Sequence, residues 1–284
     1  MPDGWQWDST LFLGSAAHYE RGRLPYAPGF AETLADALGL DGRGRLLDVG
    51  CGPGIVTLAL AHLFSDAVGL DPDRDMLLMA ERQAARRGVT NVRWVRARAE
   101  DLPAGLGGFR AVVFAQSFHW TDRERVATTV LDMLEPGGVF IHMSDLKNPP
   151  PLPEPLPHPA PPLTGIEELV RRHLGPVRRA GQGTLPHGTP GREDLVLAGA
   201  GFEDFRRHVV PSERVAVRSA DDIVAWVFSL SGSAPHLFGD RLEDFERELR
   251  ALLRQASPDG VFAERLPPTE IMTWRSPRSA PRRR

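Results

Sequence analysis

The sequence has little of what marks a secreted, membrane-spanning or nucleic-acid-binding protein. It contains one cysteine, Cys51, so no disulfide can form within the chain. The formal net charge is only −3 at pH 7, which argues against nucleic acid as a partner. The longest uncharged apolar stretch, from Ala111 to Thr121, is well short of the roughly 20 residues that a membrane helix needs.

A secretion signal is also missing from the N-terminal residues, which show no basic region followed by an apolar run and a cleavage site. We therefore expect a cytoplasmic protein with no membrane partner. The composition, 42% hydrophobic and 25% charged, is typical of a globular protein. One basic cluster, Arg275–Arg284 with five arginines, departs from this balance, and its proline and serine content predicts a solvated tail.

From Arg45 onward, apolar runs alternate with helical patterns. Strands are predicted at 46–49, 67–70, 92–95, 111–115 and 139–143. Helices are predicted at 55–64, from Asp71-Pro72 to Gly88, and at about 123–134, the second with proline at its first position and glycine past its end. Five strands with intervening helices and short loops imply an α/β fold with a doubly wound, parallel sheet.

The flanking segments are less regular. Spacing of apolar residues predicts a helix at 30–38 that Gly39 closes, while the proline-dense segment 148–163 excludes helix and sheet. Helices are also expected at 165–174, 193–200, 220–229 and 241–255, an extended stretch at 205–217, and a last strand at 270–274.

We expect five parts. They are a helical arm or lid at 1–44, a cofactor-binding core at 45–147, a proline-rich connector with substrate-side helices at 148–200, C-terminal strands at 201–275 with a helical cap insertion at about 219–257, and a basic tail at 276–284. One catalytic unit is expected, as a monomer or homodimer.

The strongest local signal is the run Leu46-Leu47-Asp48-Val49-Gly50-Cys51-Gly52-Pro53-Gly54. A buried strand ends here in a turn with glycine at every second position, and a helix follows. Glycine permits positive φ and a close approach of backbone to ligand, and the N–H groups of a helix start point into the same space. The run predicts a nucleotide-like cofactor.

Polar residues follow three further predicted strands. Asp71 ends the second strand about 20 residues beyond the glycine loop, where a carboxylate accepts hydrogen bonds from ribose hydroxyls, although an N-cap role suits it equally. Arg98-Ala99-Glu100-Asp101 follows the third strand, and Gln116-Ser117-Phe118-His119-Trp120 the fourth. Because ligands of open α/β sheets bind at the carboxyl ends of strands, these groups should converge on one crevice.

Taken together and in this order, the motifs across residues 46–138 resemble a class I S-adenosylmethionine-dependent methyltransferase. They read Leu-Asp-Val-Gly-Cys-Gly-Pro-Gly, Gly-Leu-Asp-Pro-Asp, Ala-Glu-Asp-Leu-Pro, Gln-Ser-Phe-His-Trp and Leu-Glu-Pro-Gly-Gly. The run from Tyr19 to Tyr26 and the Phe-His-Trp sequence are more loosely similar to the trans-aconitate methyltransferase branch. The resemblance implies a mainly parallel, seven-stranded, Rossmann-like sheet with a helical arm and a helical lid.

The resemblance also implies roles for matched positions. Gly50 and Gly52 would face the methionine part of the cofactor, Asp71 the ribose, Ala99 and Glu100 the adenine edge, and Gln116 the amino end. Tyr19 and Arg23 would cover the methionine carboxylate, for which a guanidinium is a bidentate partner. The expected cofactor set is completed by Asp48, Cys51, Pro72 and Met76.

One departure from the family pattern is Arg98, which stands where relatives place a small acidic or polar residue. The adenine amino contact is then left to Glu100, Asp101 or the backbone. A dinucleotide site is the competing interpretation of the glycine run, but Ile55 occupies the last glycine position of Gly-x-Gly-x-x-Gly.

Methyl transfer is an in-line displacement, so the protein mainly aligns donor and acceptor and excludes water. His119 is the candidate base for a protonated acceptor, with an orienting or packing role as the alternative. Trp120 is expected to supply an apolar wall or a cation–π contact. His18, Tyr26 and Trp226 are candidate substrate contacts, each with packing as the alternative. No metal is expected, because His142 and Asp145 lack a second acidic partner.

The favoured function is therefore methyl transfer from S-adenosylmethionine to oxygen, nitrogen or carbon of a small organic molecule, in secondary metabolism, with S-adenosylhomocysteine as product. A cofactor-binding protein without methyl transfer, either a pericyclic-reaction catalyst or a sensor, is the alternative. A tRNA or protein methyltransferase is a weaker one, because the near-neutral charge predicts no broad basic surface.

Overall fold

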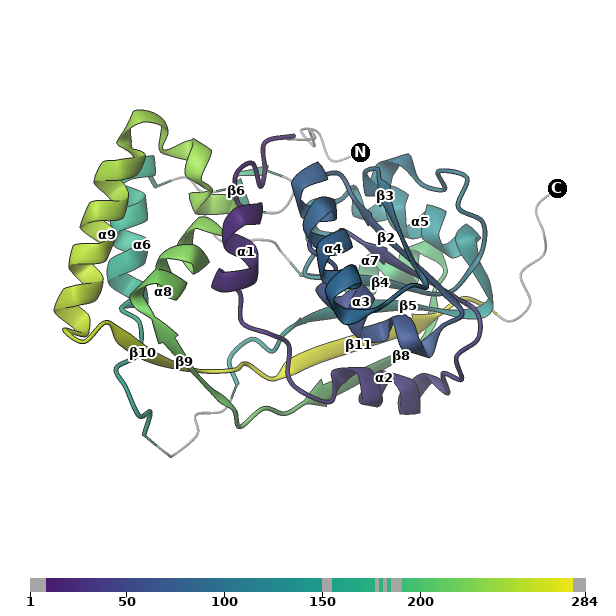
Figure 1. Ribbon diagram of the computed structural model, residues 1–284. Helices are drawn as coiled ribbons and strands as arrows, with labels where there is room; N and C mark the ends of the chain where they lie inside the picture. Colours follow the sequence, from purple (N-terminus) through teal and green to yellow (C-terminus); the bar gives the residue numbers. More distant parts are fainter. Residues whose placement is uncertain (1–8, 150–154, 177–178, 181–182, 185–190, 278–284) are drawn as a thin grey trace. The chain divides into compact units, whose positions relative to one another are not determined.

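A seven-stranded sheet is the largest sheet among the described residues (Figure 1). The computed structural model describes residues 9–149, 155–176, 179–180, 183–184 and 191–277. The strand order is β3-β2-β1-β4-β5-β11-β8, with β1 to β5 parallel and β11 antiparallel to both of its neighbours. The seven strands are β1 Arg45–Val49, β2 Asp66–Asp71, β3 Val92–Arg96, β4 Phe109–Ala115, β5 Leu134–Asp145, β8 Glu203–Val210 and β11 Thr269–Arg275. The predicted fold class is confirmed.

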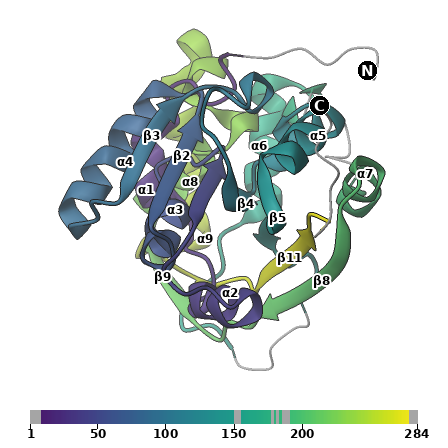
Figure 2. The ribbon, with the colours of Figure 1, turned by 90° about the vertical axis from the view of Figure 1, so that its right-hand side faces the viewer.

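Helices cover both faces of this sheet, with α3 and α4 on one side and α5 and α7 on the other (Figure 2). The helices of this part are α2 Phe30–Leu38, α3 Ile55–Leu60, α4 Arg74–Arg87, α5 Arg123–Met133 and α7 Glu193–Ala200, with short 3₁₀ turns η1 Ala61–Leu63, η2 Ala99–Asp101 and η3 Phe118–Trp120. Buried apolar side chains such as Leu47, Val112 and Phe140 fill the space between the sheet and α5 and α7. Removal of this apolar surface from water supplies the main stabilisation of the fold.

The chain divides into two compact units, each assembled from three segments. Unit 1 contains residues 1–27, 147–189 and 211–268, and unit 2 contains residues 28–146, 190–210 and 269–284. The seven-stranded sheet belongs to unit 2. The five-part division expected from the sequence is finer than these units and stays a prediction.

Unit 1 is mainly helical. Its elements are α1 Ala16–Gly22, α6 Leu163–Leu174, α8 Ala220–Phe228, α9 Leu242–Ala256, the antiparallel pair β9 Val215–Ser219 and β10 Val261–Arg265, the short pair β6 Arg179–Ala180 and β7 Gly183–Thr184, and the 3₁₀ turns η4 Ser231–Ser233, η5 Pro235–Leu237 and η6 Gly239–Arg241. Buried side chains of α6, α8 and α9 form its core, with Phe238 and Phe245 stacked at a centroid distance of 4.0 Å. Among the described residues, no helix is both long and apolar enough to cross a membrane.

Several helix limits agree with the sequence-based expectations. Helix α2 covers the predicted residues and ends at Gly39, whose φ of 60° is the left-handed conformation that glycine adopts readily. Helix α8 begins at a capping box, in which Ser219 and Asp222 each bond the backbone N–H of the other. In the proline-dense segment, the described residues 148–149 and 155–162 form neither helix nor strand, as predicted, but its last residue, Leu163, already begins helix α6.

Other limits differ. Helix α4 begins at Arg74 with Asp73 as N-cap, so the predicted proline at the first helical position is wrong and Pro72 precedes the helix. Strand β5 begins at Leu134, before the strand expected at 139–143, because Leu134 already pairs with Phe109 of β4; the register then shifts, and regular pairing resumes where Val139 faces Ala111. The single extended stretch predicted at 205–217 is instead two strands, β8 and β9, which belong to different units. Strand β10 was not predicted.

Candidate active site

The glycine loop connects β1 to α3 in a conformation that only glycine adopts without strain. The φ angles of Gly50, Gly52 and Gly54 are 69°, 53° and 79°, all in the left-handed region. The backbone N–H groups of Gly50 and Cys51 both donate to the carbonyl oxygen of Leu70, at 2.7 and 3.1 Å. These two hydrogen bonds hold the loop against the end of β2. Glycine recurs at every second position because the backbone has a positive φ at each of these residues.

Two of these glycines are also required by close packing. A Cβ atom at Gly50 would lie 2.6 Å from the Cβ of Ser117, and one at Gly54 would lie 2.6 Å from the ring of Trp94. The hydroxyl of Ser117 in turn donates to the carbonyl of Val49 at 2.5 Å. Gly52 differs, because no heavy atom lies within 4 Å of a Cβ built there. The backbone at Gly52 therefore borders open space, as a loop that receives a ligand must.

Trp94 is a supporting residue that the sequence reasoning missed. It lies on β3, and its ring would be 2.3 Å from a Cβ at Gly69 as well as against Gly54. A glycine inside a predicted strand, such as Gly69, signals that another group approaches the backbone closely. That signal, together with an aromatic residue on the neighbouring strand, would have identified the contact.

Asp71 holds the loop in place through its carboxylate. One oxygen, Oδ2, accepts from the backbone N–H of Gly52 at 2.9 Å, and Oδ1 accepts from the N–H of Asp73 at 2.9 Å. Burial raises the pKa of Asp71 to about 6, although these two N–H groups act in the opposite direction. Each carboxylate oxygen retains a second lone pair, so these contacts leave capacity to accept from ribose hydroxyls.

Asp48 lies at the end of β1 and is almost fully buried. Its Oδ2 accepts from the hydroxyl of Thr57 at 2.6 Å, and its Oδ1 has no partner among the described residues. Burial raises the pKa of Asp48 to about 7, and the charge of Asp71 adds to this effect. An unsatisfied buried acceptor at the strand end fits a ligand that brings a donor, such as the α-ammonium of a methionine group.

Cys51 is a free, buried thiol within the loop. Burial, and to a lesser degree the charges of Asp71 and Asp48, raise the pKa of this thiol well above its ordinary value. A thiolate is thus disfavoured, so the environment of Cys51 does not activate it as a nucleophile. Among the described residues, no group of three or more histidine, cysteine, aspartate and glutamate side chains could hold a metal ion.

At the end of β3, the carboxylates considered for the adenine amino group are already engaged. Asp101 forms an ion pair with Arg98 at 2.6 Å, and both of its oxygens accept from that guanidinium. Glu100 is buried, and its Oε1 accepts from the backbone N–H of Asp122 at 2.8 Å, at the start of α5. Which of the three alternatives left open by the sequence, Glu100, Asp101 or the backbone, contacts the adenine amino group stays a prediction.

The end of β4 contributes Gln116 and the 3₁₀ turn η3. Gln116 is exposed with a φ of 55°, its N–H donates to the carbonyl of Met143 at 2.9 Å, and its Nε2 donates to Asp145 at 3.1 Å. His119 is half-buried, and its ring lies 4.9 Å from that of Trp120. Two further predicted contacts lie on the β2 side, where Met76 is buried in α4 and the carbonyl of Pro72 accepts from Arg96.

The strand register brings these groups to one edge of the sheet. Asp48 is level with Gly69 on β2 and with Val113 on β4, and Asp71 is level with Arg96 on β3. The order β3-β2-β1-β4-β5 places the reversal of winding between β1 and β4, and this point is where open α/β sheets bind ligands. The structure thus brings together Asp48, the glycine loop, Asp71 and Gln116.

Five predicted site residues lie in unit 1, on or near two of its helices. They are His18, Tyr19, Arg23, Tyr26 and Trp226. The guanidinium of Arg23 lies 5.0 Å from the centroid of the Tyr19 ring, and its Nη2 donates to the carbonyl of Ser229 at 2.9 Å. The Nε of Arg23 is buried and has no partner among the described residues. His18 packs on Phe228, and burial lowers its pKa. Their roles toward cofactor and acceptor stay predictions.

Helix α1 is held tightly within unit 1. A Cβ at Gly22 would meet the backbone of Ala225 on α8 at 2.5 Å, so the two helices touch at this glycine. The buried guanidinium of Arg218 donates to the carbonyl of Gly22 at 2.6 Å and pairs with Glu264 at 2.6 Å. Because α1 packs closely against α8, the positions of Tyr19 and Arg23 are fixed relative to α8.

Comparisons with known proteins agree with this geometry. The methyltransferase domain family matches residues 46–138. The uncharacterized methyltransferase Rv3342 of Mycobacterium tuberculosis is 34% identical over 132 residues, which are 46% of this chain and 51% of that protein. The chain thus spans about half the length of these curated relatives.

Two solved structures share the fold. The YcgJ protein of Bacillus subtilis has a TM-score of 0.52 at 16% identity, covering 88% of this chain and 98% of that one. The [4+2]-cyclase SpnF has a TM-score of 0.52 at 20% identity, covering 95% of this chain and 93% of that one. Residues 46–138 therefore form a class I S-adenosylmethionine-dependent methyltransferase domain, and S-adenosylmethionine is the cofactor of that family. The predicted family is confirmed for residues 46–138.

Proposed function

We propose that this chain transfers the methyl group of S-adenosylmethionine to a small organic acceptor. One observation carries the proposal: the backbone at Gly52 borders open space, and its N–H is held by Asp71 at the point where β1, β2 and β4 end. Three left-handed glycines in this loop leave no side chain between the backbone and a ligand. The family match covers residues 46–138, and we propose methyl transfer for the whole chain.

The proposed cofactor contacts follow from the places of the residues. Gly50, Cys51 and Gly52 face the methionine part, with the unsatisfied Oδ1 of Asp48 as acceptor for the ammonium. Asp71 accepts from the ribose, next to Pro72 and Met76. The backbone at Ala99 and Glu100 reads the adenine edge, and Gln116 lies at the amino end. Tyr19 and Arg23 bind the carboxylate, and the Nε of Arg23 supplies an unused donor.

For the acceptor, we propose that His119 orients rather than deprotonates. Its ring is packed beside that of Trp120, which restricts its motion and suits a wall of a binding site. His18, Tyr26 and Trp226 are the further proposed acceptor contacts. Because the bound cofactor supplies an electrophilic methyl group, alignment and exclusion of water are the protein's main tasks.

Three further expectations about this protein rest on the sequence alone. A cytoplasmic location, a role in secondary metabolism and a monomeric or homodimeric state stay predictions. A nucleic-acid or protein substrate is not proposed, because the net charge of −3 offers no broad basic surface.

Two measurements on the full chain test the proposal. Calorimetric titration with S-adenosylhomocysteine is expected to show one site, and the same titration with NAD is the matched control for a dinucleotide site. Formation of S-adenosylhomocysteine is then measured with panels of carboxylates, phenols and amines. Absence of binding to S-adenosylmethionine and S-adenosylhomocysteine refutes the proposal. Binding without product from any acceptor supports the non-transferring alternative.

The role of His119 is tested once an acceptor is known. The variant His119→Gln is expected to lower kcat with an unchanged pH dependence, because an orienting side chain donates no proton in the rate-determining step. A general base contributes about 10²–10⁴-fold, and its loss removes the acidic limb of the pH profile. A change of that kind would assign base catalysis to His119.

A further inference from the structure

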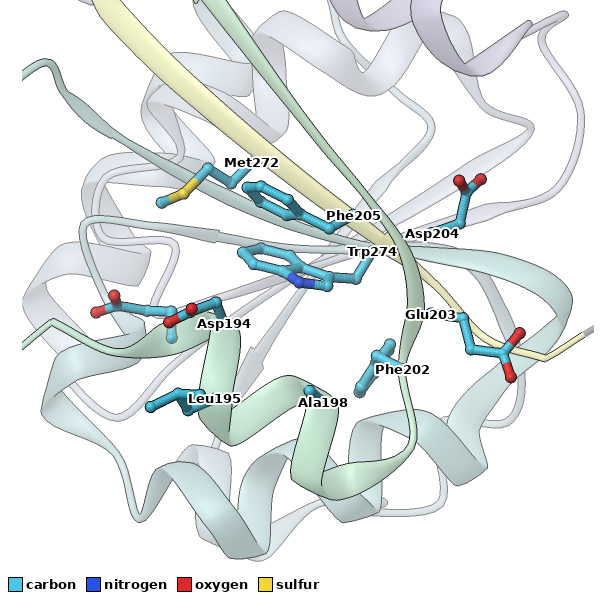
Figure 3. Close-up of a pocket in the computed structure, with 10 residues that line it drawn as sticks. Asp194, Leu195, Ala198, Phe202, Glu203, Asp204, Phe205, Met272 and Trp274 are labelled. Atoms are coloured by element: carbon cyan, nitrogen blue, oxygen red, sulfur yellow. The ribbon is translucent and has the colours of Figure 1, made fainter.

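A pocket of about 440 Å³ lies at the far edge of the seven-stranded sheet, away from the loop that we assign to the cofactor (Figure 3). Helix α7 and the last two strands in the order, β11 and β8, form its walls. None of the residues that line it belongs to the predicted active site. Its size is within the range of ligand pockets, so it is large enough for several side chains.

The floor of the pocket is aromatic. Phe205 and Trp274 lie side by side with ring centroids 5.0 Å apart, and Met272 lies next to them on β11 (Figure 3). Trp274 is buried, but Phe205 is 45% exposed and Leu195 on α7 is 55% exposed. Large apolar side chains exposed together at a concave site indicate that something covers them.

Carboxylates surround this aromatic floor. Asp194 on α7 and Glu203 on β8 flank the aromatic pair from opposite sides (Figure 3), and both are exposed. Neither forms an ion pair with a described residue. The other two are engaged, Glu193 with Arg123 at 3.8 Å and Asp204 with Arg206 at 2.8 Å. The pocket therefore suits a cation with an apolar stem, above all a guanidinium, which stacks on aromatic rings and pairs with carboxylates.

A segment with this chemistry follows the pocket directly in the chain. Strand β11, which supplies Trp274, ends at Arg275, and the guanidinium of Arg275 already lies 3.7 Å from the carboxylate of Asp204. Residues 278–284 contain four arginines, at 278, 282, 283 and 284. Pro277 is three residues from Trp274, a span of at most about 11 Å, and the next seven residues extend by at most about 25 Å. The basic segment can therefore reach every side of the pocket.

We propose that the chain's own basic segment, residues 278–284, docks in this pocket with its arginines against Phe205, Asp194 and Glu203. Tethering through β11 makes the association intramolecular, so even weak ion pairs and cation–π contacts suffice to populate it. Docking removes the exposed ring of Phe205 from water and neutralises the two carboxylates without a partner. It also shields the edge strand β8 from pairing with another chain.

A disulfide trap in the full chain tests this docking. The only native cysteine, Cys51, is buried, so introduced cysteines react without interference. Ala280→Cys is combined with Leu195→Cys at the pocket, and in the matched control with Leu78→Cys, an exposed position on α4 of the same unit. Under mild oxidation at low salt, the intramolecular crosslink at position 195 is expected to form about fivefold more than at position 78.

A second pair of variants separates charge recognition from mere proximity. In the Asp194→Asn/Glu203→Gln background, or at 1 M salt, the excess at position 195 is expected to fall to the level of the control, because exposed ion pairs are screened. Hydrogen exchange of 193–200 is expected to be slower in the native chain than in the Arg282→Gln/Arg283→Gln/Arg284→Gln variant. Equal yields at 195 and 78, unchanged exchange, or crosslinks only between two chains would overturn the proposal.

Discussion

Alanine substitution at three left-handed glycines separates the binding role of the cofactor loop from its backbone strain. Gly42, Gly50 and Gly52 have φ angles of 79°, 69° and 53°, so alanine costs a similar strain at each, about 1–2 kcal/mol. They differ in what a new methyl group meets. At Gly42 and Gly52 no heavy atom lies within 4 Å, whereas at Gly50 the methyl group would lie 2.6 Å from the Cβ of Ser117.

The expected stabilities follow from these distances. Gly42→Ala and Gly52→Ala are expected to lower the free energy of unfolding by the same amount, about 1–2 kcal/mol. Gly50→Ala is expected to cost about 1–3 kcal/mol more, because Ser117 is held by its bond to Val49 and cannot move away freely. Chemical denaturation of the three variants beside the native chain measures this order.

The expected affinities follow a different order. Of the two glycines with open space around a new Cβ, Gly52 borders the space that we assign to the methionine part, so Gly52→Ala is expected to weaken S-adenosylhomocysteine binding by at least about tenfold, or 1.4 kcal/mol. Gly42→Ala is expected to bind as the native chain does, since it lies before β1, at the opposite end of that strand. Calorimetry under identical conditions compares them. Unchanged affinity in Gly52→Ala, or an equal loss in Gly42→Ala, would refute the placement of the cofactor at this loop.

Three further outcomes are expected. Because burial raises the pKa of Asp48 to about 7 and of Asp71 to about 6, the folded chain binds more protons than the unfolded chain between about pH 4 and 7, so these two groups make stability fall as pH rises through that window. Asp48→Asn is therefore expected to flatten this fall in melting temperature between pH 5 and 8, and parallel curves would contradict it. Trp94→Ala removes the ring under Gly54 and Gly69 and is expected to cost about 2–4 kcal/mol of stability and to weaken S-adenosylhomocysteine binding, whereas Trp94→Phe retains most of both; denaturation and calorimetry on the two variants decide this. Arg23→Gln is expected to weaken S-adenosylhomocysteine binding about tenfold or more, while Arg21→Gln on the same helix, whose exposed guanidinium pairs with Asp221 and Asp222, leaves the affinity within about twofold; equal effects would remove Arg23 from the cofactor site.

The strand ends were predictable because their signals are local. An apolar run followed by glycine at every second position can form only a buried strand and a tight turn, and the three positive φ angles agree with that prediction. Asp71 was selected by its distance from the loop along the chain, and the structure places it 2.9 Å from the N–H of Gly52. Gly39 and Gly88 end their helices as their positions after apolar periods indicated.

Contacts between distant segments were not predictable in this way. Trp94 supports the loop from a strand 40 residues later in the chain, and its signal, the glycine at position 69, lies on the neighbouring strand β2 and not in the local pattern of β3. The capping role considered for Asp71 belongs to Asp73, because the backbone turns once more before α4 begins. The stretch from Phe205 to Val217 looks like one strand by propensity, but Pro211 lies within it, where a backbone donor is missing, and β8 and β9 join different units.

The sequence by itself determined the order of strands and helices, the glycine loop and the family, because each rests on residues close together in the chain. Tertiary structure decided which acceptors are already engaged. It turned Glu100 toward α5, paired Asp101 with Arg98, and left Oδ1 of Asp48 without a partner. It also gathered Phe205, Trp274 and Asp194 into one pocket. Burial and pairing depend on groups that meet only in the folded chain, so no local pattern specifies them.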